Sequence, residues 1–223
     1  MSLYPILDTA LLRAHNIPLN AAVEAALSFP VRYVQIRHKA TFDRETLAGI
    51  EECAKLRHDG RLILNDRADY ARMFGLGLHV GQDDLPPGEA RQILGPYEPG
   101  KGGELGFSTH NEAQLAAAPF ESLSYVALGP IFGTKSKEKP DPDVGLENLR
   151  AWRKLSPLPL VAIGGITLET APAVLEAGAD FVSIISALWP APYTLKAFGH
   201  QIETWLKTLQ AAHQAHSKKD SAS

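Results

Sequence analysis

The chain has 223 residues, of which 45% are hydrophobic and 21% are charged, a composition typical of globular proteins. Its 22 basic and 25 acidic residues give a net charge of −3, which argues against a nucleic-acid-coating surface, so any affinity for phosphate must come from a local cluster. The single cysteine, Cys53, excludes an intrachain disulfide, and the lack of a signal-peptide pattern or of about 18 consecutive apolar residues favours a cytoplasmic protein with no membrane or nucleic-acid partner.

Eight short β-rich segments alternate with segments of helical spacing, an order that indicates parallel β–α–β units. We expect strands at Tyr4–Asp8, Tyr33–Arg37, Leu62–Asp66, Leu78–Val80, Glu104–Ser108, Tyr125–Gly129, Leu160–Ile163 and Phe181–Ile185. We expect helices at Leu19–Phe29, Arg44–His58, Arg67–Phe74, Gly88–Leu94, Asn111–Ala118, Leu146–Leu155, Leu168–Ala177 and Tyr193–Ala212. Eight such units predict an α/β protein of the (β/α)8 TIM barrel class, whereas the alternative, an open doubly wound sheet, would normally use fewer strands.

The barrel is expected to be a single domain over residues 1–212. The Gly/Pro-rich segment Pro96–Gly103 indicates an exposed loop before the fifth strand. The tail from His213, residues 213–223, is polar and poor in apolar side chains, so we expect it to be disordered.

In a TIM barrel the active site forms at the C-terminal ends of the strands, so the polar residues there are the candidates. After the second strand, Gln35, Arg37 and Lys39 share one face because side chains alternate along a strand, and His38 takes the other. One amide and two cations in a row suit an anion clamp. The alternative is a solvated strand end whose cations pair with the next helix.

Two carboxylates follow neighbouring strands, Asp66 after the third and Asp84 after the fourth. Either alone could be a helix cap or a turn residue. As a pair beside a cationic clamp they suit Mg²⁺, which takes one or two carboxylates together with substrate phosphate oxygens.

The fifth and sixth strands lead into hydroxyl-bearing loops. Ser108 and Thr109 could bind phosphate, or one of them could cap the helix that begins at Asn111. His110 could carry a proton, although a lone histidine is more often structural. The sixth strand breaks at Gly129-Pro130 and continues into a basic loop that carries Thr134, Lys135, Ser136 and Lys137.

The seventh strand ends at Gly164-Gly165 and the eighth at Ile185-Ser186. These are the two loops in which TIM barrels often hold a phosphate on backbone amides. The chain thus offers a cationic anion site, suited to a diphosphate with Mg²⁺, and a neutral site, suited to a monophosphate. The cationic site comprises Arg37, Lys39, Asp66, Asp84 and Lys137, and the neutral site comprises Gly165, Ile185 and Ser186 with Thr134 and Ser136 facing it.

In these motifs the chain resembles the thiamine phosphate synthase family. The matching segments are Gln35-x-Arg37-x-Lys39, Asn65-Asp66, Gly81-Gln-x-Asp84, Ser108-Thr-His110, Gly129-Pro-Ile-Phe-x-Thr134-x-Ser136-Lys137, Gly145-Leu, Ala162-Ile-Gly-Gly-Ile166, Ala177-Gly-Ala-Asp180 and Ile185-Ser186. The resemblance implies a transferase of thiamine biosynthesis. Such an enzyme joins a hydroxymethylpyrimidine diphosphate to a thiazole phosphate, which could be a carboxylated tautomer, and releases pyrophosphate with the help of Mg²⁺.

Residue by residue, the resemblance implies three sets of contacts. The pyrimidine diphosphate would be held by Gln35, Arg37, Lys39, Asn65, Ser108 and Lys137, of which Arg37, Lys39, Ser108 and Lys137 would be catalytic. The thiazole phosphate would be held by Thr134, Ser136, Gly165, Ile185 and Ser186, and Mg²⁺ by Asp66 and Asp84. The partners implied are small phosphorylated molecules, and a homodimer is left open.

The chain departs from the family pattern at a few positions. His38 stands where the family usually has Glu, Gly133 where Pro is common, and Ser136 where Thr is frequent. The first strand is a loose match, and Asp8 receives no role. The alternatives are a related thiazole tautomerase with a histidine near His110, an isomerase with a phosphate-binding barrel, and a non-catalytic barrel that binds thiamine phosphates.

Overall fold

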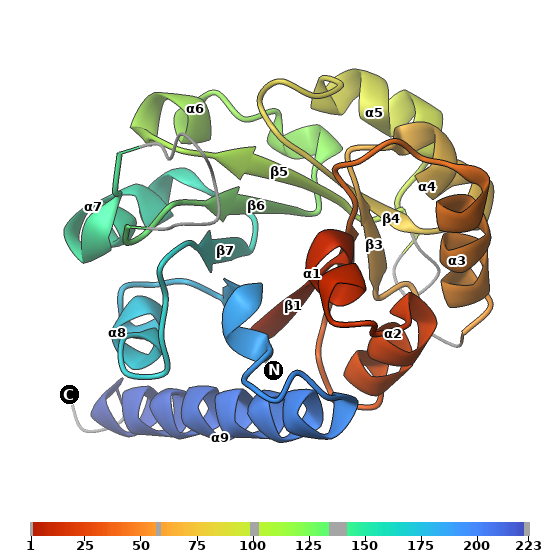
Figure 1. The fold of residues 1–223 in the computed structure, drawn as a ribbon. Helices are drawn as coiled ribbons and strands as arrows, with labels where there is room; N and C mark the ends of the chain where they lie inside the picture. The colour runs from red at the N-terminus through yellow and green to blue at the C-terminus, as the bar shows by residue number, and fades with distance from the viewer. Residues whose placement is uncertain (1, 57–58, 99–102, 134–141, 221–223) are drawn as a thin grey trace.

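The computed structural model describes residues 2–56, 59–98, 103–133 and 142–220. Eight parallel strands close into a barrel in chain order, each hydrogen-bonded to the next and the last to the first (Figure 1). The strands are β1 (Leu3–Asp8), β2 (Val34–Arg37), β3 (Leu62–Asn65), β4 (Gly77–Val80), β5 (Leu105–Thr109), β6 (Tyr125–Leu128), β7 (Leu160–Ile163) and β8 (Phe181–Ile184). Closure through the pairing of β1 with β8 confirms the predicted TIM barrel and rules out the open sheet.

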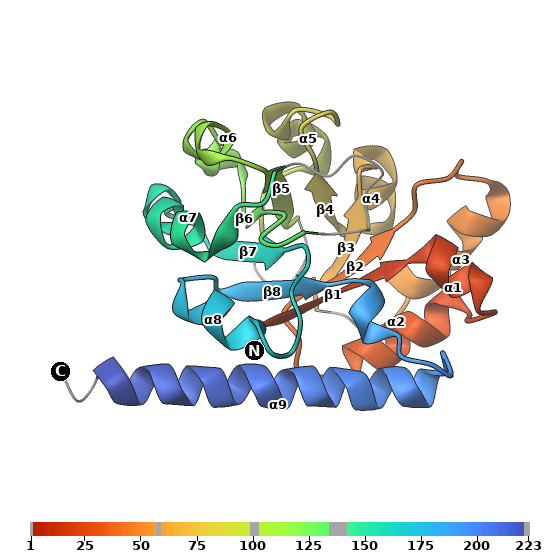
Figure 2. The ribbon, with the colours of Figure 1, turned by 60° about the vertical axis from the view of Figure 1, so that its left-hand side comes forward.

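Helices surround the barrel on its outside (Figures 1 and 2). They are α1 (Thr9–Ala14), α2 (Leu19–Leu27), α3 (Arg44–Ala54), α4 (Ala68–Phe74), α5 (Pro87–Leu94), α6 (Glu112–Ala116), α7 (Gly145–Trp152), α8 (Ala171–Glu176) and α9 (Leu195–Asp220), with short 3₁₀ turns η1 (Phe120–Ser122), η2 (Arg153–Leu155) and η3 (Ser186–Leu188). Among the described residues, no helix combines the length and apolarity that a membrane span needs.

Side chains alternate strictly between the two faces of the barrel wall, which produces two separate cores. Outward-facing residues such as Leu62, Leu64 and Val126 pack against the helices in the larger core. The inward-facing residues form a smaller core that fills the end of the barrel opposite the strand C-termini: Tyr4, Tyr33, Ile63, Tyr125, Ala127 and Val161, with Phe181 packed against them. The polar strand-end residues therefore lie above a packed aromatic floor.

Helix α1 is absent from the sequence-based expectation. It is only six residues long, and it begins because Asp8, the last residue of β1, accepts hydrogen bonds from the backbone N–H groups of Ala10 and Leu11. The capping residue was visible in the sequence, but its place at a strand end hid the short helix that follows.

Helix α9 extends beyond the predicted domain limit. The expected boundary after residue 212 falls inside α9, which continues to Asp220, so residues 213–220 are helical in the structure, and residues 221–223 lie outside the described residues. The side chains of Phe198 and Trp205, which belong to this helix, are buried. The helix lies beside α2 and α8 (Figure 2), and Nε2 of His213 forms a hydrogen bond with Oγ of Ser2. Packing against the barrel stabilises the helix along a buried face that reaches Leu209 and Ala212.

Candidate active site

A pocket of about 890 Å³ opens at the C-terminal ends of the barrel strands. Residues from all eight strands or the loops after them contribute to its wall. Ten of the predicted site residues line it: Gln35, Arg37, Lys39, Asn65, Asp66, Asp84, Ser108, Gly165, Ile185 and Ser186. The other three, Thr134, Ser136 and Lys137, lie outside the described residues.

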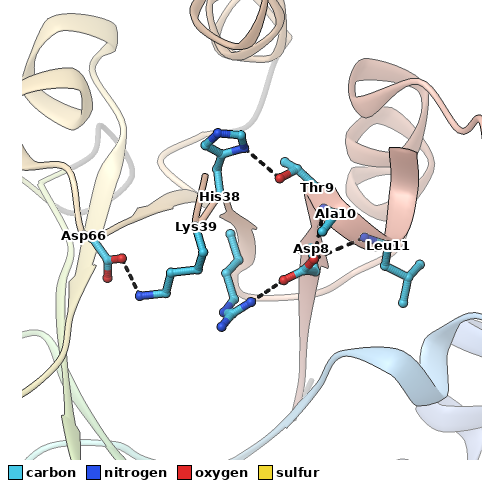
Figure 3. A network of polar contacts seen from close by, with 8 residues as sticks. Asp8, Thr9, Ala10, Leu11, His38, Lys39 and Asp66 are labelled. Atoms are coloured by element: carbon cyan, nitrogen blue, oxygen red, sulfur yellow. Dashed lines mark hydrogen bonds and ion pairs between the residues drawn. The ribbon is translucent and has the colours of Figure 1, made fainter. Parts of the chain in front are cut away.

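The predicted anion clamp on β2 faces the pocket, and each of its cations has a carboxylate partner. Arg37 Nη1 donates to Oδ2 of Asp8, and Lys39 Nζ lies 2.5 Å from Oδ2 of Asp66 (Figure 3). Register pairs Asp8 directly with Arg37 across β1 and β2. Asp8, which had no predicted role, therefore both caps α1 and orients an arginine of the clamp.

His38 lies on the opposite face of β2, as the alternation of side chains predicts. It is buried, with Nδ1 2.7 Å from Oγ1 of Thr9 (Figure 3). Its Nε2 lies 3.1 Å from the backbone carbonyl oxygen of Thr41. These contacts tie the segment that carries Lys39 to the start of α1. The departure from the usual Glu at this position therefore affects the support behind the clamp and not its pocket face.

The candidate metal ligands Asp66 and Asp84 are neighbours in the pocket. Burial raises the pKa of the Asp66 carboxyl, Lys39 opposes this by a hydrogen bond, and the nearby Asp84 carboxyl adds to it. Asp66 does not cap α4, whose first turn has no side-chain cap, and Asp84 uses Oδ2 to accept from the Gly81 N–H at 2.7 Å. Two adjacent carboxylates, of which Asp66 has a raised pKa, fit a divalent cation, which would favour the charged form of Asp66.

Asn65 Nδ2 gives the pocket a donor on the same side. This atom is buried and has no hydrogen-bond partner among the residues that the structure describes. An unpaired buried donor costs free energy unless a ligand satisfies it. Asn65 is therefore suited to donate to an oxygen of a bound anion.

On the opposite side, the ends of β6 and β7 are joined by backbone hydrogen bonds. The N–H groups of Ile131 and Phe132 donate to the carbonyls of Ile163 and Gly164 at 2.9 and 3.1 Å. Gly165 has φ +65°, and a Cβ on it would lie 2.6 Å from the Gly133 carbonyl oxygen. Only glycine allows so close an approach of the two loops.

The loop after β5 uses its residues differently. Ser108 faces the pocket, whereas Thr109 faces outward and donates to the Ala127 carbonyl at 2.9 Å. The cap of α6 is Asn111, so neither hydroxyl serves that purpose. His110 lines the pocket with Nδ1 2.6 Å from the Gly129 carbonyl oxygen, which fixes the orientation of the ring.

Several residues that line the pocket had no predicted role, among them Tyr4, His79 and Gln82. Tyr4 and His79 are inward-facing strand residues, and the signal that could have found them is the same alternation that places Gln35 and Asn65. Gln82 Nε2 donates to the Ser108 carbonyl at 2.5 Å and joins the loops after β4 and β5.

Comparison with known proteins places this geometry in a family. A family model described as thiamine monophosphate synthase matches residues 3–188, which include every described residue of the pocket. The chain belongs to the thiamine monophosphate synthase family. The resemblance inferred from the motifs is thereby confirmed.

Individual members of the thiamine monophosphate synthase family are similar over most of their length. Thiamine-phosphate synthase of Koribacter versatilis (strain Ellin345) is 49% identical over 164 residues, which cover 73% of this chain and 75% of that protein. Thiamine-phosphate synthase of Chloroflexus aurantiacus (strain ATCC 29366 / DSM 635 / J-10-fl) is 38% identical over 192 residues, 83% of this chain and 84% of that protein. Thiamine phosphate pyrophosphorylase from Pyrococcus furiosus, a solved structure, superposes with a TM-score of 0.73 at 26% identity and covers 93% of this chain and 96% of its own.

Proposed function

We propose that this protein is a thiamine-phosphate synthase that joins 4-amino-2-methyl-5-(diphosphooxymethyl)pyrimidine to 4-methyl-5-(2-phosphoethyl)thiazole and releases pyrophosphate. The observation that carries the proposal is the meeting of two unlike anion sites in one pocket of a barrel from this family. One side offers cations and paired carboxylates, and the other offers backbone. Two substrates with different phosphate charges need such an arrangement.

On the cationic side, Gln35, Arg37, Lys39, Asn65 and Ser108 bind the pyrimidine diphosphate. Asp8 orients the Arg37 guanidinium through a hydrogen bond, and Nδ2 of Asn65 can donate to a phosphate oxygen. Mg²⁺ held by Asp66 and Asp84 would neutralise charge that develops on the departing diphosphate.

The reaction needs no general base. The bond between the pyrimidine methylene carbon and the diphosphate oxygen breaks, and its electron pair leaves on that oxygen. The lone pair of the thiazole nitrogen then forms the new carbon–nitrogen bond, so no proton has to move. Catalysis by this chain consists of positioning the two substrates and stabilising the leaving group.

On the neutral side, Gly165, Ile185 and Ser186 bind the thiazole phosphate, and the close approach of the loops after β6 and β7 brings it toward the pyrimidine. The family motif alone supports the remaining contacts: Thr134 and Ser136 to the thiazole phosphate and Lys137 to the pyrimidine diphosphate. A cytoplasmic location and a homodimer remain predictions.

The deciding experiment is to incubate the purified full-length chain with both substrates and Mg²⁺ and to assay thiamine phosphate by chromatography and mass spectrometry. We expect product only when both substrates are present, and loss of product when a chelator removes the metal. A protein that is folded yet forms no thiamine phosphate would contradict the proposal.

The tautomerase alternative makes a separate prediction at His110, which lines the pocket. If this residue carried an essential proton, His110→Ala would abolish turnover. In the synthase it orients the loop after β5 through the Gly129 carbonyl, so the variant should lose only part of its coupling rate. Isomerisation of the thiazole substrate alone, measured by NMR, would favour the tautomerase.

A further inference from the structure

A series of hydrogen bonds crosses the floor of the pocket and connects Gln35 to Ser108, two of the predicted substrate-binding residues. Gln35 Nε2 donates to the hydroxyl of Tyr4 at 3.0 Å, which lies 2.7 Å from the hydroxyl of Tyr125. The Tyr125 hydroxyl lies 3.0 Å from Nδ1 of His79, and Nε2 of His79 lies 2.9 Å from Oγ of Ser108. The five residues come from five different strands, so the chain spans the barrel.

The interior members of this chain of hydrogen bonds are buried. Tyr4 and Tyr125 are at most 1% exposed, and burial raises the pKa of both hydroxyls. His79 is 8% exposed, and each of its ring nitrogens lies against a hydroxyl, Tyr125 at Nδ1 and Ser108 at Nε2. An uncharged imidazole has one nitrogen that donates and one that accepts.

With one proton on the imidazole, a single arrangement gives every buried proton of these groups a partner. An amide nitrogen can only donate, so the Tyr4 hydroxyl accepts from Gln35, and in this arrangement it donates to Tyr125. Tyr125 in turn donates to Nδ1 of His79. His79 then carries its proton on Nε2 and donates it to Ser108. The Ser108 hydroxyl proton and the Gln35 side-chain carbonyl oxygen then remain available to hydrogen-bond a ligand in the pocket.

The surrounding core is shaped to hold this chain. A Cβ on Gly106 would lie 2.1 Å from the Tyr125 ring, so this glycine leaves the space that the ring occupies. Tyr33 stacks on Tyr125 with ring centroids 5.0 Å apart, and Tyr4 meets it edge-on at 5.8 Å. Packing therefore fixes the rings whose hydroxyls make the central link.

We propose that Tyr4, Tyr125 and His79 are positioning residues that present Gln35 as an acceptor and Ser108 as a donor to one bound ring, and so select an aminopyrimidine. Its exocyclic amine can donate to Gln35 and a ring nitrogen can accept from Ser108. The inference rests on the proposed function, which supplies the substrate. The 4-oxo analogue, with a carbonyl and a ring N–H, presents the opposite pattern and should be rejected by about 100-fold or more in kcat/KM.

The test removes one hydroxyl from the middle of the chain. Tyr125→Phe keeps the ring and uncouples Gln35 from Ser108, so we expect KM for the aminopyrimidine diphosphate to rise by about 10-fold. Discrimination against the 4-oxo analogue should fall, while KM for the thiazole phosphate stays unchanged. Tyr33→Phe is the matched control. The Tyr33 hydroxyl lies in the same core, but it interacts with Arg32 and is not part of the series of hydrogen bonds from Gln35 to Ser108.

Two further measurements separate positioning from general damage. Because Tyr125 acts through Ser108, the effects of Tyr125→Phe and Ser108→Ala on KM should be non-additive in a double-mutant cycle. In the ligand-free wild type, ¹⁵N NMR should show the His79 proton on Nε2. A proton on Nδ1, additive effects, or equal discrimination in Tyr125→Phe and Tyr33→Phe would overturn the proposal. Failure of the wild type to make thiamine phosphate would instead refute the proposed function, and the NMR result would still stand.

Discussion

On the β2–β4 side of the pocket the candidate anion contacts are side chains, whereas on the β7–β8 side they are backbone and small residues. Arg37 and Lys39 are each paired with a carboxylate, so the first side is an electrostatic arrangement that can be changed one group at a time. Gly165 has no side chain and contributes only its backbone, which the loop after β6 holds in place. The Gly133 carbonyl oxygen of that loop lies 2.6 Å from where the Cβ of a larger residue would be. Anion binding on the first side can be tested by removing a charged group from a side chain. The contribution of Gly165 on the second side can be tested only by adding a side chain.

The largest effect is expected from the carboxylate pair. Asp84→Asn keeps an oxygen that can accept from the Gly81 N–H but removes the charge that suits it to bind Mg²⁺. We expect kcat to fall by about 100-fold and its dependence on Mg²⁺ concentration to shift to higher values, with little change in melting temperature.

Asp83→Asn is the matched control, since Asp83 is adjacent and also lines the pocket. It should leave the Mg²⁺ titration unchanged. Equal effects of the two variants would remove Asp84 from the metal site.

The backbone side is tested by adding a methyl group. Gly165→Ala puts a Cβ into the carbonyls of Phe132 and Gly133 at a positive φ, so we expect a loss of about 2 kcal/mol of stability and a rise of about 10-fold in KM for the thiazole phosphate. KM for the pyrimidine diphosphate should change less. Denaturant unfolding and steady-state kinetics with each substrate varied provide the measurements.

Gly75→Ala separates backbone strain from crowding. Gly75 has φ +67°, yet nothing lies within 4 Å of an added Cβ. It should cost only the strain of the left-handed conformation, about 1 kcal/mol, and leave both KM values alone. A Gly165→Ala enzyme with an unchanged KM for the thiazole phosphate would contradict the role of Gly165.

The smallest effect on activity is expected from Asp8, which supports Arg37 of the cationic side. Asp8→Asn can still cap α1 but no longer offers Arg37 a charged partner. Because both groups are partly exposed, we expect a cost of about 1 kcal/mol, seen as a rise of about 5-fold in KM for the pyrimidine diphosphate. Asp43→Asn, at the cap of α3, controls for the loss of a capping charge. A KM unchanged by Asp8→Asn would mean that Arg37 does not need this partner.

Much of the barrel could be predicted because strand and helix patterns are local. The strand-end residues Gln35, Arg37, Asn65 and Asp66 could be predicted too, since the fold class alone determines which end of a strand carries the site. Local patterns also explain the errors, since the six-residue α1 is too short for a clear period and the polar end of α9 hides its continuation to Asp220.

The supporting contacts could not be predicted, because they join residues that are close only after the barrel closes. Asp8 meets Arg37 through the register of β1 with β2, 29 residues apart in the chain. The Tyr4 and Tyr125 hydroxyls meet across the barrel from positions separated by 121 residues. No spacing in the sequence encodes such pairs, whereas the ligands that they support follow directly from strand alternation.

Gly106 and Tyr125 are directly paired across β5 and β6, and the ring of one occupies the space that any side chain on the other would need. The two positions therefore depend on each other, because a side chain at position 106 has no room while the tyrosine ring is in place. We expect a relative that keeps the tyrosine to keep the glycine, and a relative with a side chain at position 106 to lack the ring. The residue types at these two positions would then indicate whether a related barrel retains the hydrogen-bonded floor.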